Sequence, residues 1–145
     1  MNPIVVWFRR DLRLYDNPAL SWAAAQGAPI LPIYIHSPGE EAPWAPGAAS
    51  RWWLHHSLSK LRNNLARQGL VLRCFEGDAM RILPSLAREL QIGALAINRL
   101  YEPHLARRDR KLFEALTSLD VITKAFDSAL LFPPGSILNG EQRPY

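Results

Sequence analysis

Short apolar runs alternate along the chain with longer segments in which apolar residues recur at helical spacing. Residues 4–8 are apolar at every position, which is typical of a strand that helices cover on both faces. Further runs predict strands at residues 29–35, 70–75, 94–98 and 121–126. This alternation predicts an α/β fold with a five-stranded open parallel sheet, doubly wound and Rossmann-like, with helices on both faces.

Two of the predicted helices have clear beginnings and ends. Asn17 offers an N-cap, Pro18 follows at the first helical position, and Gly27 ends the first helix. Ser50 is expected to cap the longest helix, which Gly69 ends. Apolar residues in this helix recur every three or four positions, so the stripe is expected to face the sheet; it consists of Leu54, Leu58, Leu61 and Leu65.

Proline complicates the pattern at two positions. Pro32 lies inside the second predicted strand, and because proline cannot donate to a strand ladder, we expect an edge or a bulge there. Asp78 predicts the cap of a third helix, which Pro84 is expected to divide into an opening turn and a main helix. A fourth helix is predicted over residues 103–119. Residues 37–49 hold many prolines and glycines and are expected to form a long loop, and long ordered loops are often functional.

Composition narrows the class of protein. A chain of 145 residues, 48% of them apolar, is the size of one domain and is too apolar to be disordered. The lone cysteine, Cys74, excludes a disulfide scaffold and is expected to be a small buried hydrophobe within its strand. A net charge of +4 is a weak argument for a polyanionic partner. Since no apolar run is long enough for a membrane span and the start lacks a signal-peptide pattern, we expect a cytoplasmic protein.

The glycines exclude the commonest nucleotide-binding loops. The eight glycines never form G-x-G, and the sequence has no G-x-x-x-x-G-K-[ST] loop. The first strand is instead followed by Arg9, Arg10 and Asp11. A dinucleotide dehydrogenase is therefore improbable, because nothing lets the backbone approach a pyrophosphate closely.

Candidate binding residues follow the predicted strands, because ligands of doubly wound sheets bind outside the carboxyl ends of the strands. These residues are Arg10, Asp11, Ile35, His36, Ser37 and Glu102. Arginine suits an anionic or planar ligand, whereas Asp11 could instead pair with an arginine and cap the turn. Glu102 could contact a ligand or cap the helix that follows it.

The start of the longest helix supplies a further candidate, Arg51, beside adjacent tryptophans. Trp52 and Trp53 lie about 100° apart around a helix, so both cannot join the leucine stripe. Trp53 could reach the sheet side, and Trp52 would point elsewhere. Adjacent His55 and His56 make a poor metal site, because ligand pairs on helices prefer spacings of three or four. No carboxylate pair, Ser/His/Asp set or metal-ligand set supports hydrolysis or acid–base catalysis.

Four segments of the chain form a recognisable series of motifs. They are Trp7 to Leu14 with Asp16 to Leu20; Ser50 to Leu54 with Ser57 and Leu58; Asn98 to Pro103 with Arg108 and Asp109; and residues 130–145 with Pro133, Pro134, Gly135, Pro144 and Tyr145. Together they resemble the N-terminal α/β domain of the DNA photolyase and cryptochrome family. The second segment is most similar to plant cryptochromes and their bacterial relatives. The resemblance covers essentially the whole chain in order.

The resemblance implies light-driven chemistry that the cofactor carries. In photolyases, reduced FAD donates an electron to a cyclobutane pyrimidine dimer flipped out of DNA, and a second pigment in or beside the α/β domain harvests light. That antenna is a folate, a deazaflavin or another flavin, and Arg51 matches an arginine that contacts deazaflavin in some relatives. The acidic residue that those relatives carry before the counterpart of Glu102 is Leu100 here, and His104 and Leu105 replace an Asn-Glu pair of folate-type enzymes. We expect a folate, methenyltetrahydrofolate, before a deazaflavin.

The resemblance also implies an organisation in which residues 1–131 form the α/β domain and residues 132–145 begin the linker toward a helical FAD domain. FAD, DNA with pyrimidine dimers and the helical domain would be partners of the full-length protein only. The parent family is a carbon–carbon lyase, and this chain alone is expected to be inactive. Two alternatives stay open: a cryptochrome-type blue-light photoreceptor module, and a stand-alone nucleotide-binding protein of similar fold.

Overall fold

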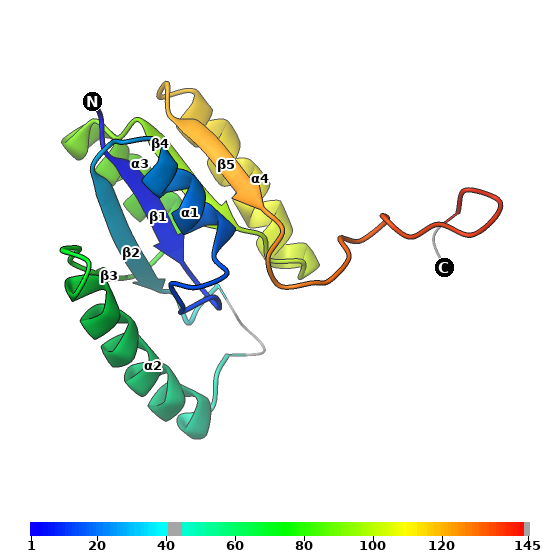
Figure 1. The fold of residues 1–145 in the computed structure, drawn as a ribbon, viewed down its shortest axis with the longest axis horizontal. Coiled ribbons are helices and arrows are strands. Elements are labelled where there is room, and N and C mark those ends of the chain that lie inside the picture. Colours follow the sequence, from blue (N-terminus) through cyan, green and yellow to red (C-terminus); the bar gives the residue numbers. More distant parts are fainter. Residues whose placement is uncertain (41–44, 144–145) are drawn as a thin grey trace.

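A computed structural model describes residues 1–40 and 45–143 of the chain. Strands and helices alternate as β1 (Ile4–Phe8), α1 (Pro18–Ala25), β2 (Ile30–His36), α2 (Ala48–Ala66), β3 (Arg73–Glu76), α3 (Ala79–Leu90), β4 (Ala94–Asn98), α4 (Pro103–Thr117) and β5 (Ile122–Phe126) (Figure 1). The strands form one parallel sheet in the order β3-β2-β1-β4-β5. The predicted five-stranded α/β sheet is confirmed.

The strand order reverses beside β1. The chain moves outward from β1 to β2 and β3, and then returns to place β4 on the other side of β1, where Ile4 pairs with Ala94. Such a reversal opens a crevice at the carboxyl ends of the two strands on either side of it. The carboxyl ends of β1, β2 and β4 are therefore the place for a ligand.

Each face of the sheet carries its own apolar core. Val5 and Trp7 pack with α3 and α4 on one face, whereas Val6 and Phe8 pack with α1 and α2 on the other. Figure 1 shows α1 in front of the sheet and α3 behind it. All five residues of β1 are buried, as a strand covered on both faces requires. The sheet is doubly wound.

Helix caps follow the sequence signals at α1 and α3. The Asn17 side chain accepts a hydrogen bond from the Leu20 N–H, and Gly27 adopts φ +67° after the helix. The Asp78 carboxylate accepts from the Met80 N–H at 2.7 Å. Both caps supply an acceptor for N–H groups that have no partner inside their helix.

Two predictions of helix structure are wrong. The N-cap of α2 is Gly47 and not Ser50, because Gly47 is extended and its carbonyl already accepts the first intrahelical bond from the Arg51 N–H. Ser50 therefore lies inside the helix. Pro84 does not divide α3, which continues through it. Proline at this position removes one N–H donor, and the rest of the helix retains its bonds and its apolar face.

Two predictions of strand structure are also wrong. Pro32 lies in β2, which has neighbours on both sides and is no edge strand. The Pro29 carbonyl accepts from Ile4 in β1, and since backbone groups alternate sides along a strand, the missing N–H of Pro32 faces β3. Pairing with β3 starts only at Ile33, so proline removes no ladder bond there. Cys74 is exposed, because β3 is the edge strand.

The leucine stripe of α2 covers the sheet over half of its length. Leu61 and Leu65 are buried in the core, whereas Leu54 and Leu58 are partly exposed. Figure 1 shows the first half of α2 beyond the carboxyl ends of the strands. This overhang leaves its side chains free to form a wall beside the strand ends.

The last described residues, from Asp127 onward, contain no helix and extend away from the sheet (Figure 1). The boundary after residue 131 stays a prediction, and the Pro144 and Tyr145 motif lies outside the described residues, as does part of the predicted loop. None of the described helices is both long enough and apolar enough to cross a membrane.

Candidate functional site at the carboxyl ends of the strands

A buried amide network fills the crevice between β1 and β4. The Asn98 side-chain amide donates to Asp11 at 2.5 Å and to Asn17 at 2.8 Å. The Asn98 side-chain oxygen accepts from the Ala19 N–H at 3.1 Å, and the other Asp11 oxygen accepts from the Arg9 N–H at 2.8 Å. Asp11 therefore holds the turn after β1, as one part of its structural alternative predicted, whereas no ion pair joins it to an arginine side chain within the described residues.

The same network occupies the start of α1. In dinucleotide-binding sheets, the N–H groups of this helix bind a pyrophosphate. Here the Ala19 N–H donates to Asn98, and the Leu20 N–H donates to Asn17. Side-chain oxygens thus stand where phosphate oxygens would bind, which agrees with the absence of a G-x-G loop from the sequence.

Arg9 is a buried cation beside this network. Its guanidinium donates to Asp109 at 2.5 Å and to the Asn98 carbonyl, and it lies 5.0 Å from the centre of the Trp7 ring. The Arg108 guanidinium lies 4.9 Å from the same ring and pairs with Asp109 at 2.7 Å. Burial lowers the pKa of Arg9, although Asp109 opposes this shift. Two guanidinium groups and one carboxylate thereby fix the indole ring of Trp7.

Two buried N–H donors in this cluster have no acceptor within the described residues. They are Trp7 Nε1 and Arg9 Nε. Both residues line a cavity of about 40 Å³, here termed the central hollow, whose walls are Trp7, Arg9, Arg10, Tyr34, Ile35, Ser37, Leu100, Leu105 and Arg108. Leaving a buried donor without an acceptor is costly, so these two atoms stand out among the polar groups of the site.

The central hollow brings together three of the predicted site residues. Arg10, Ile35 and Ser37 line it, and Glu102 stands nearby in an ion pair with Arg10. Glu102 is the N-cap residue of α4 and its carbonyl accepts from the Ala106 N–H, so the capping alternative holds for its backbone, but its side chain makes no capping hydrogen bond. The Ser37 hydroxyl donates to the Gly77 carbonyl at 2.5 Å and ties the end of β2 to the end of β3.

His36 and Arg51 belong to a second cavity on the α2 face. We term it the α2 hollow; it measures about 310 Å³ and is lined by Tyr34, His36, Arg51, Leu54, His55, Leu58, Cys74 and Phe75. Arg51 Nη1 donates to the Pro46 carbonyl at 2.8 Å, which holds the side chain along the end of the loop. Because Tyr34 lines both hollows, they adjoin at the end of β2.

The tryptophans of α2 do not join the core. Trp52 and Trp53 are 63% and 69% exposed, so the expectation that Trp53 reaches the sheet side is wrong. Trp52 packs edge-on against His56 with 4.3 Å between ring centres. The overhang of α2 explains their exposure, because this part of the helix has no sheet beneath it.

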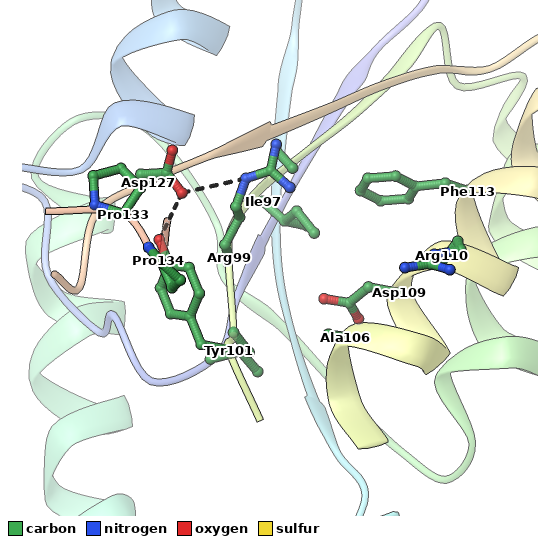
Figure 2. A pocket seen from close by; sticks show the side chains of 12 residues that line it. Ile97, Arg99, Tyr101, Ala106, Asp109, Arg110, Phe113, Asp127, Pro133 and Pro134 are labelled. Atoms are coloured by element: carbon green, nitrogen blue, oxygen red, sulfur yellow. Dashed lines mark hydrogen bonds and ion pairs between the residues drawn. The ribbon is translucent and has the colours of Figure 1, made fainter. Parts of the chain in front are cut away.

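A third cavity, here termed the β4–β5 hollow, lies beside the carboxyl ends of β4 and β5. It measures about 610 Å³, and Figure 2 shows its walls on β4, β5, α4 and the segment of Pro133 and Pro134. Asp127 accepts from the Tyr101 hydroxyl at 2.6 Å and pairs with Arg99 at 3.3 Å. Burial and the bond to Asp127 raise the pKa of Tyr101. Within the described part of the chain, no three His, Cys, Asp or Glu residues form a metal-binding group.

Sequence reasoning missed Asn98, Asp109 and Glu40 as organisers of the site. Asn98 and Asp109 lie inside recognised segments, but their partners are far away in the sequence. Asp109 binds Arg9, 100 residues away, and Asn98 binds Asp11 and Asn17, 87 and 81 residues away. Glu40 lay in a loop without periodicity, and its carboxylate binds both Arg108 and the Ala79 N–H at the start of α3. A polar residue ending an apolar strand was the available signal for Asn98.

These features define a doubly wound α/β domain in which side chains occupy the switch point and the hollows beside it are lined by arginines and aromatic rings. Comparison with known proteins gives the particular family. The chain belongs to the DNA photolyase family, whose model matches residues 4–145. The predicted resemblance is therefore confirmed.

Relatives include photolyases and cryptochromes. A deoxyribodipyrimidine photo-lyase of Agrobacterium fabrum is 38% identical over 99% of this chain and 29% of the relative, and cryptochrome-1 of Arabidopsis thaliana is 34% identical over 97% and 21%. Among solved structures, a class III photolyase from Agrobacterium tumefaciens matches with a TM-score of 0.90, 37% identity and coverage of 99% and 29%. The chain spans less than a third of the length of these relatives.

A further solved structure that resembles this chain is an archaeal photolyase. The archaeal photolyase of Sulfolobus tokodaii matches with a TM-score of 0.85, 25% identity and coverage of 94% of this chain and 32% of that chain. It is described as holding two FAD molecules, with the implication of a novel light-harvesting cofactor.

Proposed function

We propose that this chain is the antenna-pigment domain of a deoxyribodipyrimidine photolyase. The observation that carries the proposal is the pair of buried, unpartnered donors, Trp7 Nε1 and Arg9 Nε, on residues that line the central hollow. Leaving such a donor without an acceptor costs on the order of 1–3 kcal/mol. A ring carbonyl or ring nitrogen of a pigment would supply the missing acceptor.

The sizes of the two adjoining hollows suit different parts of a planar pigment. The central hollow, at about 40 Å³, admits only a small polar edge, whereas the α2 hollow, at about 310 Å³, has apolar and aromatic walls suited to a ring system. A bound pigment of this kind absorbs near-ultraviolet or blue light and passes the excitation to FAD. The residues of the two hollows bind and orient it and carry out no bond chemistry.

Among antenna pigments we propose a folate, methenyltetrahydrofolate, before a deazaflavin or a flavin. Leu100 supplies an apolar wall of the central hollow at the position where deazaflavin-type relatives have an acidic residue. Arg10, Ile35, Ser37, His36 and Arg51 would contact the pigment, and Glu102 would position Arg10 through their ion pair. Asp11 acts through the turn that it holds.

We further propose that the whole protein repairs cyclobutane pyrimidine dimers in DNA with light. Its FAD, its lesion site and its DNA contacts would belong to a helical domain in the part of the relatives that this chain does not span, with residues 132–145 leading toward it. This chain alone would be inactive in repair. The likeness to Arabidopsis cryptochrome-1 favours a second candidate, a blue-light photoreceptor module.

Pigment reconstitution tests the antenna proposal directly. The chain is mixed with methenyltetrahydrofolate, a deazaflavin or FMN, and binding is followed by pigment fluorescence and by equilibrium dialysis. We expect the folate to bind most tightly. Loss of the indole donor in Trp7→Phe should weaken binding about tenfold, because an acceptor in the central hollow loses a buried hydrogen bond.

Paired variants of α2 provide the control. Arg51→Ala should weaken pigment binding, whereas Arg67→Ala, at the C-cap of the same helix and outside the α2 hollow, should leave it unchanged. Circular dichroism verifies that each variant is folded. If the folded chain takes up no pigment, or if Arg51→Ala and Arg67→Ala behave alike, the proposed site is wrong.

A further inference from the structure

One face of α4 carries four cationic or potentially cationic side chains beside the proposed antenna site. His104, Arg107, Arg108 and Lys111 follow one another at spacings of three, one and three, which places them along a single stripe of the helix. The stripe forms one wall of a cavity of about 380 Å³, termed here the α4 hollow, whose other walls are Glu40, Asp78 and Met80.

The acidic groups of the α4 hollow are already engaged. Glu40 binds Arg108 and the Ala79 N–H, and Asp78 binds the Met80 N–H. Arg108 is in turn held by Glu40 and Asp109, with only 14% of its side chain exposed. The carboxylates are therefore committed to capping α3 and to fixing Arg108.

The other three basic side chains of the stripe have no partner in the described part of the chain. No hydrogen bond or ion pair holds Arg107, Lys111 or His104 within residues 1–40 and 45–143. Since the first two N–H groups of α3 beside them donate to Glu40 and Asp78, attraction for an anion comes from the side chains themselves. The α4 hollow thus combines unpaired positive charge with room for a phosphate or a pair of carboxylates.

Arg108 connects this hollow to the proposed pigment site. It lines both the central hollow and the α4 hollow, so the two cavities lie on either side of one side chain. A ligand whose ring edge occupies the central hollow could extend a flexible tail past Arg108 without crossing the core.

We propose that the α4 stripe binds the anionic tail of the antenna pigment. This inference rests on the proposed antenna function and narrows the class of pigment to one with a tail of phosphate or carboxylate groups. Arg107 and Lys111 bind the tail, and the buried Arg108 positions it. A flavin phosphate and the glutamyl carboxylates of a folate share this chemistry.

Matched pairs of pigments separate the ring from the tail. FMN is compared with riboflavin, which has the same ring without the phosphate, and methenyltetrahydrofolate with one glutamyl residue is compared with its triglutamyl form. We expect the member with more negative charge to bind about tenfold more tightly in at least one pair, as charge-assisted hydrogen bonds of this type provide. Which pair responds identifies phosphate or carboxylate as the tail.

Variants of α4 assign the effect to the stripe. The double variant Arg107→Ala, Lys111→Ala should abolish the difference within the responding pair and leave thermal stability unchanged, because neither side chain has a partner to lose among residues 1–40 and 45–143. Arg110→Ala is the control, since Arg110 lies on the same helix but lines the β4–β5 hollow. The tail preference should also fade as salt is added.

The outcomes distinguish the two proposals. Equal binding of both members of each pair, or a tail preference that survives the double variant, overturns the inference while leaving the antenna function intact. Failure of every pigment to bind the folded chain overturns the antenna function and the inference with it.

Discussion

Adjacent residues of the same type have different tasks in this protein. The Arg9 side chain is 6% exposed and pairs with the buried Asp109, whereas Arg10, one position later, is 54% exposed and pairs with Glu102 at the surface. A buried pair becomes costly when one partner is removed, because the other charge stays buried without compensation. An exposed pair is solvated in either case and contributes little to stability.

Replacing each acid by its amide should show this difference. Asp109→Asn is expected to lower the free energy of unfolding by about 3–5 kcal/mol, because it leaves Arg9 buried without its counter-charge. Glu102→Gln, the matched change at the surface pair, should cost less than about 1 kcal/mol. Urea unfolding followed by circular dichroism measures both, and equal losses would contradict the assignment of Arg9 as a structural cation.

The reactivity of the single thiol reports its surroundings. Desolvation by its neighbours raises the pKa of Cys74, and this effect outweighs the opposing charge of Arg62. The midpoint of thiolate formation should therefore lie at a higher pH in the folded protein than in the protein unfolded in urea. Reaction rates with an aromatic disulfide reagent across the alkaline range give the two midpoints.

The charge of Arg62 can be tested in the same assay. Arg62→Ala should move the folded midpoint to still higher pH, whereas Arg67→Ala, near the end of the same helix, should not. A folded midpoint at or below the unfolded one would show that Cys74 is fully solvated.

Some residues of this chain favour the helix in which they lie, and others disfavour it but are accommodated because tertiary packing holds the helix in place. Caps at Asn17 and Asp78 fix the starts of α1 and α3. In contrast, Pro84 persists inside α3 because Leu83, Leu86 and Ala87 are buried against the sheet and keep the helix on its face. Packing of an apolar face contributes more to helix stability than the single bond that proline removes.

Replacing this proline should therefore stabilise the protein. Pro84→Ala restores one N–H donor and good helix propensity, and the greater entropy of the unfolded chain offsets part of that gain. We expect the free energy of unfolding to rise by about 1–2 kcal/mol, seen as a higher urea midpoint with an unchanged slope. A lower midpoint would show that the ring of Pro84 itself packs against the core.

The whole molecule is organised by one sheet that two cores share. Residues of β1 alternate between the α1/α2 core and the α3/α4 core, so neither face can lose its packing without affecting the strands of the other. The same sheet aligns the carboxyl ends of β1, β2 and β4, which brings the central, α2 and α4 hollows to one edge. Stability and the proposed ligand binding thus depend on the same strands.

Truncation of one core should consequently destabilise both. Leu61→Ala removes a fully buried side chain on the α2 face and should cost about 2–5 kcal/mol. The free energy of opening measured by amide hydrogen exchange should fall in α3, on the opposite face, by the same amount as in α2. The reciprocal variant, Leu112→Ala in α4, should act in the same way, and a loss of protection confined to one face would indicate two independent units.

The sequence by itself determined the order and type of the elements, because periods of 2 and 3.6 and the cap residues are local properties. It also identified the family, and it placed Arg10, Ile35 and Ser37 at one edge, since parallel strands align their carboxyl ends. Only the tertiary structure decided which candidate side chains face a cavity and which are engaged in ion pairs or hydrogen bonds with other residues. Arg9 with Asp109, Asn98 with Asp11 and Glu40 with Arg108 join residues that are far apart in the chain, so their partners depend on strand order and helix placement and not on spacing along the sequence.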